Sequence, residues 1–272
     1  MSLPNGFKSE TVKLNSFRIE LERAGKGLPV LLLHSEEGYE LAGSGRAIAE
    51  MLAQTHEVYL PRIPGFGKSS LPDSIRSIDD ISYLWLDLLD RLDLENVNVV
   101  GFSVGAWLAL EIATKSCVRL KSLVLCGAVG VKFGGAYDRD IEDIYFHSPA
   151  AVRAMRFHNV AADPHFDLTN LSRRNALVHA RQRETIAKFC WDPYFHSPSL
   201  RHRLGRVKVP SLVVHGTKDR ITKTKYGRAL ARTLPDAQYI GIPQTGHFPH
   251  IECPEAFVVA IDKFWSGTSD LN

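Results

Sequence analysis

The chain has 272 residues, of which 44% are hydrophobic and 23% are charged, so it is long enough for one large α/β core with an insertion. Its 33 basic and 30 acidic residues are interspersed and give a net charge of +3, which excludes the basic stripe of a nucleic-acid-binding protein. No apolar stretch approaches the roughly 20 residues of a membrane span. We therefore expect neither a nucleic-acid nor a membrane partner, and the sequence leaves open whether the chain forms a homo-oligomer.

Four cysteines are widely spaced without a C-x-x-C pair, and the first residues lack the apolar core of a signal peptide. Both features favour free thiols in a reducing compartment, so we expect a cytoplasmic protein. The cysteines are Cys117, Cys126, Cys190 and Cys253.

The first half of the chain predicts a hairpin followed by alternating strands and helices. Residues 11–27 indicate two short strands around the Asn15-Ser16 turn, at the edge of a sheet. Residues 29–33 (PVLLL) form a short apolar run of the kind that a buried parallel strand needs. Helix-like and strand-like patterns then alternate, with helices over 45–54 and 78–92 and strands over 56–62, 97–102 and 120–125.

This alternation stops between Gly130 and Leu200, where the sequence indicates several short helices rich in His and Arg. We interpret this segment as an inserted cap. Regular alternation of strands and helices on either side of it predicts a parallel sheet covered by helices. After the insertion we expect strands over 211–215 and 237–242, with helices over 224–234 and from about Pro254 to Trp265.

Ser103 lies at the turn between the strand over 97–102 and the helix that follows, within the sequence GFSVG. Glycine on both sides of a sharp strand-to-helix reversal allows two backbone segments to approach closely. The G-x-S-x-G pattern presents the serine Oγ at the carboxyl end of a sheet and aims the first helical amides at the same point. It is typical of a nucleophile, although a buried serine at an ordinary tight turn fits this pentapeptide equally well.

A serine nucleophile needs a general base and a third group that orients the base. His247 follows the last predicted strand and Asp219 follows the strand over 211–215, so both loops should emerge at the same edge of the sheet as Ser103. His250 is expected to pack or to form a hydrogen bond beside them. Asp219 could instead be a turn residue and His247 an ordinary loop histidine, but the chain order Ser, Asp, His argues against coincidence.

These motifs resemble those of the α/β-hydrolase family, and the resemblance covers nearly the whole chain. GFSVG matches the nucleophile elbow, GTKDRIT the acid loop, GHFPHIECPEAF the histidine loop, and IPGFGKSS the loop after the family's fourth strand. The resemblance implies an α/β fold with an eight-stranded, mostly parallel sheet, helices on both faces and a helical cap inserted after the sixth strand. The core would comprise residues 1–129 and 201–272, and the cap residues 130–200.

An oxyanion hole needs backbone amides aimed at the developing negative charge. The amide of Val104, the residue after the nucleophile, is one expected donor, and the resemblance assigns the second to Glu36. The family usually has His-Gly in that loop, whereas this chain has HSEEG over residues 34–38. An acidic pair at this place opposes an oxyanion electrostatically unless both carboxylates turn outward.

The resemblance implies a cofactor-free serine hydrolase in which Ser103 attacks a carbonyl, His247 moves the proton and Asp219 orients His247. A carboxylic ester, thioester or lactone is the expected substrate. A carbon–carbon bond beside a ketone, as in β-diketone-like or meta-cleavage-type compounds, is the alternative, but enzymes of that class often carry a glycine-rich oxyanion loop, which SEEG is not. A lyase, a cofactor-independent oxygenase or a ligand-binding protein on the same fold also stays open.

We expect the small-molecule substrate to contact His34, Ser35 and Trp191, the last of these near the end of the cap. Arginine clusters at 173–174 and 181–183 are candidates for binding a carboxylate tail, although solvated helix faces explain most such runs. The histidines of the cap lack the H-x-x-x-H spacing that would set two metal ligands on one helical face. We therefore expect no metal site.

Overall fold

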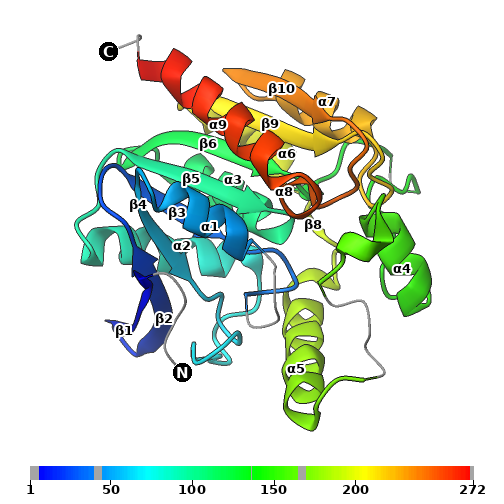
Figure 1. Ribbon diagram of the computed structural model, residues 1–272, viewed down its shortest axis with the longest axis horizontal. Coiled ribbons are helices and arrows are strands. Elements are labelled where there is room, and N and C mark those ends of the chain that lie inside the picture. The colour runs from blue at the N-terminus through cyan, green and yellow to red at the C-terminus, as the bar shows by residue number, and fades with distance from the viewer. Residues whose placement is uncertain (1–5, 40–44, 136, 165–169, 270–272) are drawn as a thin grey trace.

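The centre of the molecule is an eight-stranded sheet with the strand order β1-β2-β4-β3-β5-β6-β9-β10 (Figure 1). The computed structural model describes residues 6–39, 45–135, 137–164 and 170–269. β1 (Lys8–Leu14) and β2 (Phe17–Ala24) form the predicted antiparallel hairpin at one edge, and β2 also pairs antiparallel with β4 (Glu57–Pro61). All other neighbouring strands pair parallel, which confirms the predicted sheet.

The parallel strands are rich in apolar residues because both faces of the sheet are covered. Every residue of two of them, β5 and β9, is buried. Since the strands are parallel, their carboxyl ends lie at one edge, where the loops that follow them can meet. These strands are β4 together with β3 (Pro29–Leu33), β5 (Val97–Phe102), β6 (Leu120–Cys126), β9 (Ser211–Gly216) and β10 (Ala237–Ile242).

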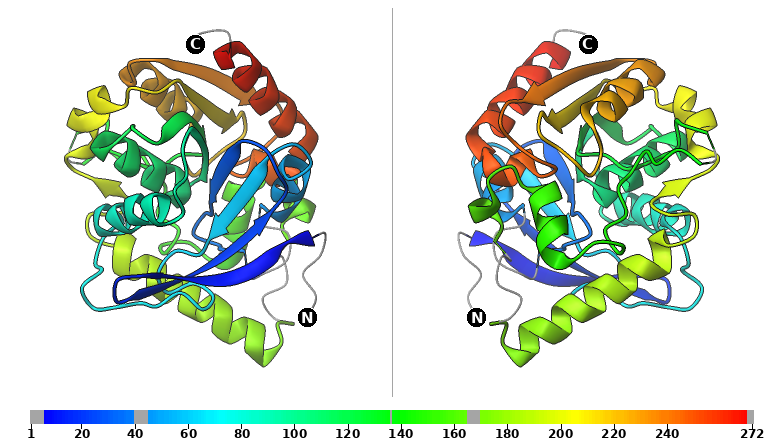
Figure 2. Two further views of the ribbon diagram at one scale, coloured as in Figure 1. Left: turned by 90° about the vertical axis from the view of Figure 1, so that its left-hand side faces the viewer. Right: turned by 90° about the vertical axis from the view of Figure 1, so that its right-hand side faces the viewer.

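Helices cover both faces of the sheet, as the two side views in Figure 2 show. Neighbouring residues of β5 face opposite sides, since Val99 belongs to one apolar cluster and Val100 to the other. The first cluster lies under α2 (Ile78–Arg91), α3 (Val104–Lys115) and α7 (Thr224–Thr233), and the second under α1 (Arg46–Leu52) and α9 (Pro254–Ser269). A short helix, α8 (Pro249–Glu252), precedes α9.

α2 shows how local sequence sets the start of a helix. The Ser77 hydroxyl accepts a hydrogen bond from the Asp80 amide (3.1 Å), which satisfies one of the first helical N–H groups. Asp79 and Asp80 place negative charge in the first turn, where the helix dipole favours it. The buried residues of α2, including Ile81, Trp85 and Leu88, then recur at helical spacing.

The insertion after β6 contains short helices, as the sequence predicts, and also one long helix that the sequence analysis did not expect. α5 alone has 18 residues, and two two-residue strands pair parallel at the base of the insertion. The elements are β7 (Gly130–Val131), α4 (Pro149–Arg156), the 3-10 helix η2 (Val160–Ala162), α5 (Arg173–Cys190) and β8 (His196–Ser197), and α6 (Leu200–Arg203) and η3 (Leu204–Arg206) then lead to β9. The boundaries of a separate cap at 130 and 200 stay a prediction.

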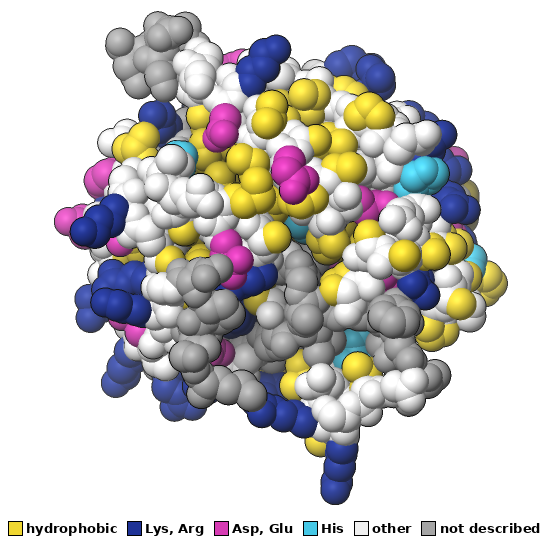
Figure 3. All heavy atoms as spheres, viewed as in Figure 1, with side chains coloured by type: hydrophobic (Ala, Val, Ile, Leu, Met, Phe, Trp, Pro, Cys, Tyr) yellow, Lys and Arg dark blue, Asp and Glu magenta, His cyan; other side chains and the backbone are white. Residues whose placement is uncertain are grey.

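The surface seen in Figure 3 carries both acidic and basic side chains. None of the helices within the described residues is long and apolar enough to cross a membrane. The thiols of all four cysteines are free.

Candidate active site

Ser103 sits at the sharp turn between β5 and α3, with backbone angles φ 50° and ψ −110°. This region is costly for a residue with a side chain, so neighbouring structure must hold it in place. The Ser103 N–H donates to the Cys126 carbonyl oxygen (2.9 Å). A Cβ at Gly101 would lie 2.4 Å from the Gly105 carbonyl oxygen, and one at Gly105 would lie 2.2 Å from the Leu33 carbonyl oxygen. Both glycines are therefore required for the turn.

His247 lies between Ser103 and Asp219 and is hydrogen-bonded to both. Its Nε2 is 3.0 Å from the Ser103 Oγ, and its Nδ1 is 2.8 Å from the Asp219 Oδ2. All three side chains are buried, and the loops that carry them follow β5, β9 and β10. With Nδ1–H donating to the carboxylate, Nε2 is free to accept the hydroxyl proton. The structure thus brings together the serine, acid and histidine that the sequence singled out.

The carboxylate of Asp219 is held by its own loop as well as by His247. Oδ1 accepts the N–H groups of Ile221 and Thr222 (2.8 and 3.1 Å), and Oδ2 accepts the Thr222 hydroxyl (2.9 Å). Burial alone would raise the pKa of Asp219, but the charge of His247 and these hydrogen bonds lower it below its ordinary value. Asp219 is therefore ionised at neutral pH. One of its carboxylate oxygens stabilises the turn that follows, and the other contacts His247.

His215, at the end of β9, is a buried neighbour that the sequence analysis did not single out. Its Nε2–H donates to the Thr222 carbonyl oxygen (2.5 Å) and lies 3.3 Å from the Asp219 Oδ2. Burial lowers the pKa of His215, so its ring is neutral. The sequence could have pointed to His215, because it ends the strand predicted over 211–215 and lies four residues before Asp219.

The two predicted oxyanion donors lie in loops at the same edge of the sheet. Val104 is the first residue of α3, so its N–H has no acceptor within the helix. Glu36 lies in the loop after β3, and β3 pairs directly with β5. Backbone N–H groups at such a junction favour an anion, which suits an oxyanion beside Ser103.

The acidic pair in this loop does not turn outward, so the electrostatic objection raised by the sequence has to be met in another way. Glu36 is only 7% exposed, and its Oε1 accepts a hydrogen bond from Nη2 of Arg156 (2.8 Å) at the end of α4. Arg156 Nη1 contacts Glu37 as well. Burial lowers the pKa of Arg156, but the charges of Glu37 and Glu36 outweigh this effect and raise it, so the guanidinium stays charged. The insertion thus supplies the cation that offsets the acids.

His34 and Ser35 hold the oxyanion loop (residues 34–38) in shape, and their contact with the substrate stays a prediction. The His34 Nδ1–H donates to the Ser35 carbonyl oxygen (2.7 Å), and its Nε2 accepts the Ile63 N–H (3.0 Å). Both ring nitrogens are therefore used, and burial lowers the pKa of His34 to about 3, so the ring is neutral. The Ser35 hydroxyl accepts the Glu37 N–H (3.2 Å) within the same turn.

The role of Trp191 as a substrate contact also stays a prediction. It lies at the C-terminal end of α5 and is 58% exposed. Its ring meets the edge of the Tyr145 ring, with centroids 5.5 Å apart. Of the two arginine clusters, Arg183 lies over the same Tyr145 ring (4.9 Å), and Arg181 is exposed.

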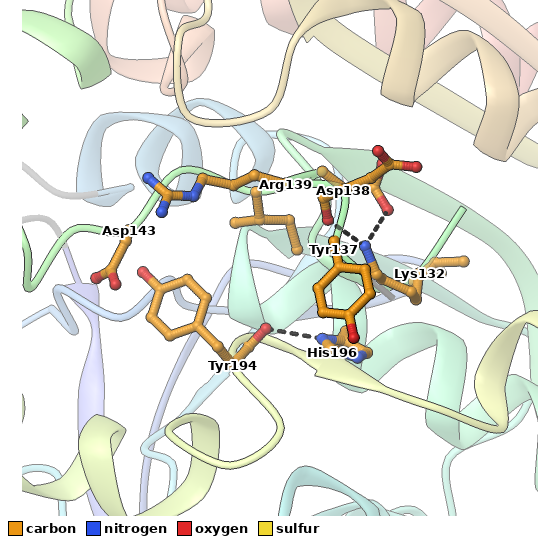
Figure 4. A pocket seen from close by; sticks show the side chains of 10 residues that line it. Lys132, Tyr137, Asp138, Arg139, Asp143, Tyr194 and His196 are labelled. Carbon is orange, nitrogen blue, oxygen red and sulfur yellow. Dashed lines mark hydrogen bonds and ion pairs between the residues drawn. The ribbon is translucent and has the colours of Figure 1, made fainter. Parts of the chain in front are cut away.

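A pocket of about 250 Å³ lies at the base of the insertion (Figure 4). Its charged side chains are paired locally: Lys132 contacts the Asp138 carbonyl and Asp140, and Arg139 pairs with Glu142 (3.1 Å). The Tyr194 hydroxyl accepts the Ile144 N–H (2.8 Å). The residues that line this pocket do not include Ser103, Asp219 or His247. No group of three or more His, Cys, Asp or Glu side chains within the described ranges could hold a metal ion.

A serine, a histidine and an aspartate hydrogen-bonded in series at the carboxyl edge of such a sheet are an arrangement typical of hydrolases on an α/β fold. The chain belongs to the alpha/beta hydrolase family, whose model matches residues 30–261. It is 28% identical to the 2-hydroxymuconate semialdehyde hydrolase of Pseudomonas putida over 261 residues, which covers 91% of this chain and 90% of that protein. It is 29% identical to the 2-hydroxy-6-oxo-6-phenylhexa-2,4-dienoate hydrolase of Burkholderia cepacia over 267 residues, covering 90% of each.

Solved structures show the same fold. A serine hydrolase from the polyaromatic hydrocarbon-degrading bacterium Cycloclasticus zankles matches with a TM-score of 0.77 at 22% identity, covering 96% of this chain and 99% of that chain. Family membership and the two relatives together identify the protein as a hydrolase.

Proposed function

We propose that Ser103 is the nucleophile of this hydrolase, that His247 is its general base and that Asp219 orients the base. The hydrogen-bond series carries this proposal, with 3.0 Å from Ser103 Oγ to Nε2 and 2.8 Å from Nδ1 to the carboxylate. The hydroxyl proton passes to Nε2 as Oγ attacks the substrate carbonyl, and the Asp219 charge stabilises the imidazolium that forms. The amides of Val104 and Glu36 stabilise the resulting oxyanion.

The proposed substrate has a carbon–carbon bond beside a ketone carbonyl, which was the alternative in the sequence analysis and not its main expectation. The names of the two relatives support this choice. 2-Hydroxy-6-oxo-6-phenylhexa-2,4-dienoate contains no ester, amide or lactone bond. Its hydrolysis therefore has to break a carbon–carbon bond next to the 6-oxo group, and we infer the same reaction type for this chain.

The triad can drive such a cleavage with balanced steps. Collapse of the tetrahedral adduct breaks the carbon–carbon bond and leaves an acyl group on Ser103. The departing carbon takes its proton from the His247 imidazolium, and conjugation to a second carbonyl or enol system spreads its negative charge before protonation. Water, deprotonated by His247, then attacks the acyl-serine, releases a carboxylic acid and restores the Ser103 hydroxyl.

A direct comparison of substrates tests this proposal. Purified protein is assayed with 2-hydroxy-6-oxo-6-phenylhexa-2,4-dienoate, by loss of its long-wavelength absorbance, and with 4-nitrophenyl acetate and butyrate. We expect kcat/KM of at least about 10⁴ M⁻¹s⁻¹ on the dienoate, with benzoate as one product, and much lower values on both esters. Ser103→Ala should abolish turnover, whereas Ser116→Ala, at the far end of α3, should retain it.

Two results would contradict the proposal in different ways. Efficient ester hydrolysis without cleavage of the dienoate would support the ester substrate that the sequence analysis expected, with the same triad. Undiminished turnover by Ser103→Ala would exclude the acyl-enzyme and favour a lyase or oxygenase in which His247 acts alone.

A further inference from the structure

The C-terminal end of α4, in the insertion, is hydrogen-bonded to three loops of the candidate site, which carry His247, Asp219 and Glu36. The Arg156 carbonyl oxygen accepts the His247 N–H (2.6 Å), and the Met155 carbonyl oxygen accepts the Arg220 N–H (3.2 Å) next to Asp219. The last carbonyls of a helix have no partner within the helix, so the histidine and acid loops satisfy them here. The Arg156 side chain meanwhile reaches the oxyanion loop at Glu36.

Close backbone approach fixes the junction between α4 and the histidine loop. A Cβ at Gly246 would lie 2.1 Å from the Arg156 carbonyl oxygen, so glycine is needed immediately before His247. Glu252 of α8 closes the same junction from the other side. One of its carboxylate oxygens accepts the Gly246 N–H (2.5 Å), and the other accepts the Asn159 N–H (2.7 Å) just after α4.

The charges at this junction bear directly on the oxyanion loop. The oxyanion loop contains two acids, Glu36 and Glu37, and the Glu36 amide is its proposed oxyanion donor. Arg156 is hydrogen-bonded to both carboxylates. The Arg156 and Glu36 side chains are 10% and 5% exposed, so solvent screens the pair weakly. Removing the cation would leave the buried Glu36 carboxylate without this ion pair beside a developing negative charge, which is unfavourable for the loop and for the oxyanion.

We propose that Arg156 is a positioning residue that couples the insertion to catalysis. Its carbonyl holds the histidine loop, and its guanidinium holds the oxyanion loop and offsets its acids. The rate at which Ser103 attacks an electrophile therefore depends on a side chain of the insertion that acts through Glu36 and Glu37. This inference rests on the proposed function, because it assigns Arg156 a role in the same reaction.

The test measures the second-order rate at which a small fluorophosphonate labels Ser103, followed by intact-protein mass and corrected for the folded fraction seen by near-ultraviolet circular dichroism. Arg156→Met keeps most of the side-chain volume and removes the charge, and it should slow labelling at least about tenfold. Arg156→Lys keeps the charge and should recover part of the rate. The triple variant Arg156→Met/Glu36→Gln/Glu37→Gln removes both negative charges of the loop together with the cation and should label faster than Arg156→Met.

Arg153→Met is the matched control, since Arg153 belongs to the same helix and contacts Asp163 and the Val160 carbonyl within the insertion. It should label at the wild-type rate. The role of Arg156 would be overturned if folded Arg156→Met were labelled at the wild-type rate, or if the triple variant were labelled no faster than Arg156→Met. The assignment of Ser103 as the nucleophile would stand in both cases. An unlabelled wild type would instead contradict the proposed function itself, and the role of Arg156 with it.

Discussion

At the scale of single residues, burial keeps two histidines beside the triad neutral. His250 stacks on Phe102, with ring centroids 3.8 Å apart, and its Nδ1 lies 3.7 Å from the Cys126 Sγ. Burial, with a smaller effect of the His247 charge, lowers the pKa of His250 to about 3. Burial lowers the pKa of His34 to about 3 as well. These two neutral rings support the elbow and the oxyanion loop, whereas His247 is the ring placed to accept a proton from Ser103.

These lowered pKa values predict that the protein loses stability on mild acidification. An unfolded histidine binds a proton below about pH 6.5, whereas the folded rings bind one only near pH 3. The free energy of unfolding should therefore fall by about 1.4 kcal/mol per pH unit for each such histidine as pH decreases through this window. Urea unfolding at pH 7, 6 and 5 measures the slope.

His250→Phe, which keeps a ring against Phe102, should reduce the loss of stability between pH 6 and pH 5 by about 1.4 kcal/mol. An unchanged slope in this variant would show that His250 is charged in the folded protein.

At the scale of elements, the strands and the elbow were the most predictable features. The strand over 29–33 has the predicted bounds, and the helix over 78–92 differs by one residue at its end. Their apolar spacing and capping residues act locally, so the sequence reports them directly. α5 was harder to predict, because most of its N-terminal half is exposed and its arginines interrupt the apolar pattern that marks a packed helix face.

The elbow should not tolerate a side chain at Gly105. The new Cβ of Gly105→Ala would meet the carbonyl oxygens of Leu33 and His34 at 2.2 and 2.6 Å, and both belong to backbone that cannot rotate away. We expect the substitution to lower the free energy of unfolding by about 2–3 kcal/mol, as seen for overpacked sites, and to slow labelling of Ser103. Chemical denaturation followed by circular dichroism measures the first effect.

Gly205→Ala, in η3, is the control, because a Cβ there meets nothing within 4 Å. It should change stability by less than about 0.5 kcal/mol. Equal stability of the two variants would mean that the elbow can relax, and it would remove the packing argument for glycine at this position.

At the scale of the whole molecule, the sequence could predict where the triad gathers but not how the insertion reaches it. Parallel strands place Ser103, Asp219 and His247 at one edge of the sheet, so strand assignment alone brings their loops together. The contact between Arg156 and Glu36 joins residues 120 positions apart. Local patterns contain no signal for that pairing, because it depends on how the insertion packs on the core. The same limit explains why the exposure of Trp191 was not foreseen.

The central claim is that Ser103 is a nucleophile activated by His247 and Asp219. The most direct measurement is the intact mass of the protein after treatment with a small fluorophosphonate, for the wild type and for Ser103→Ala, His247→Ala and Asp219→Asn. We predict one adduct on Ser103, none on Ser103→Ala, and labelling slowed by up to about 10⁴-fold when either partner is changed. An adduct on another residue, or undiminished labelling of folded His247→Ala, would contradict the account.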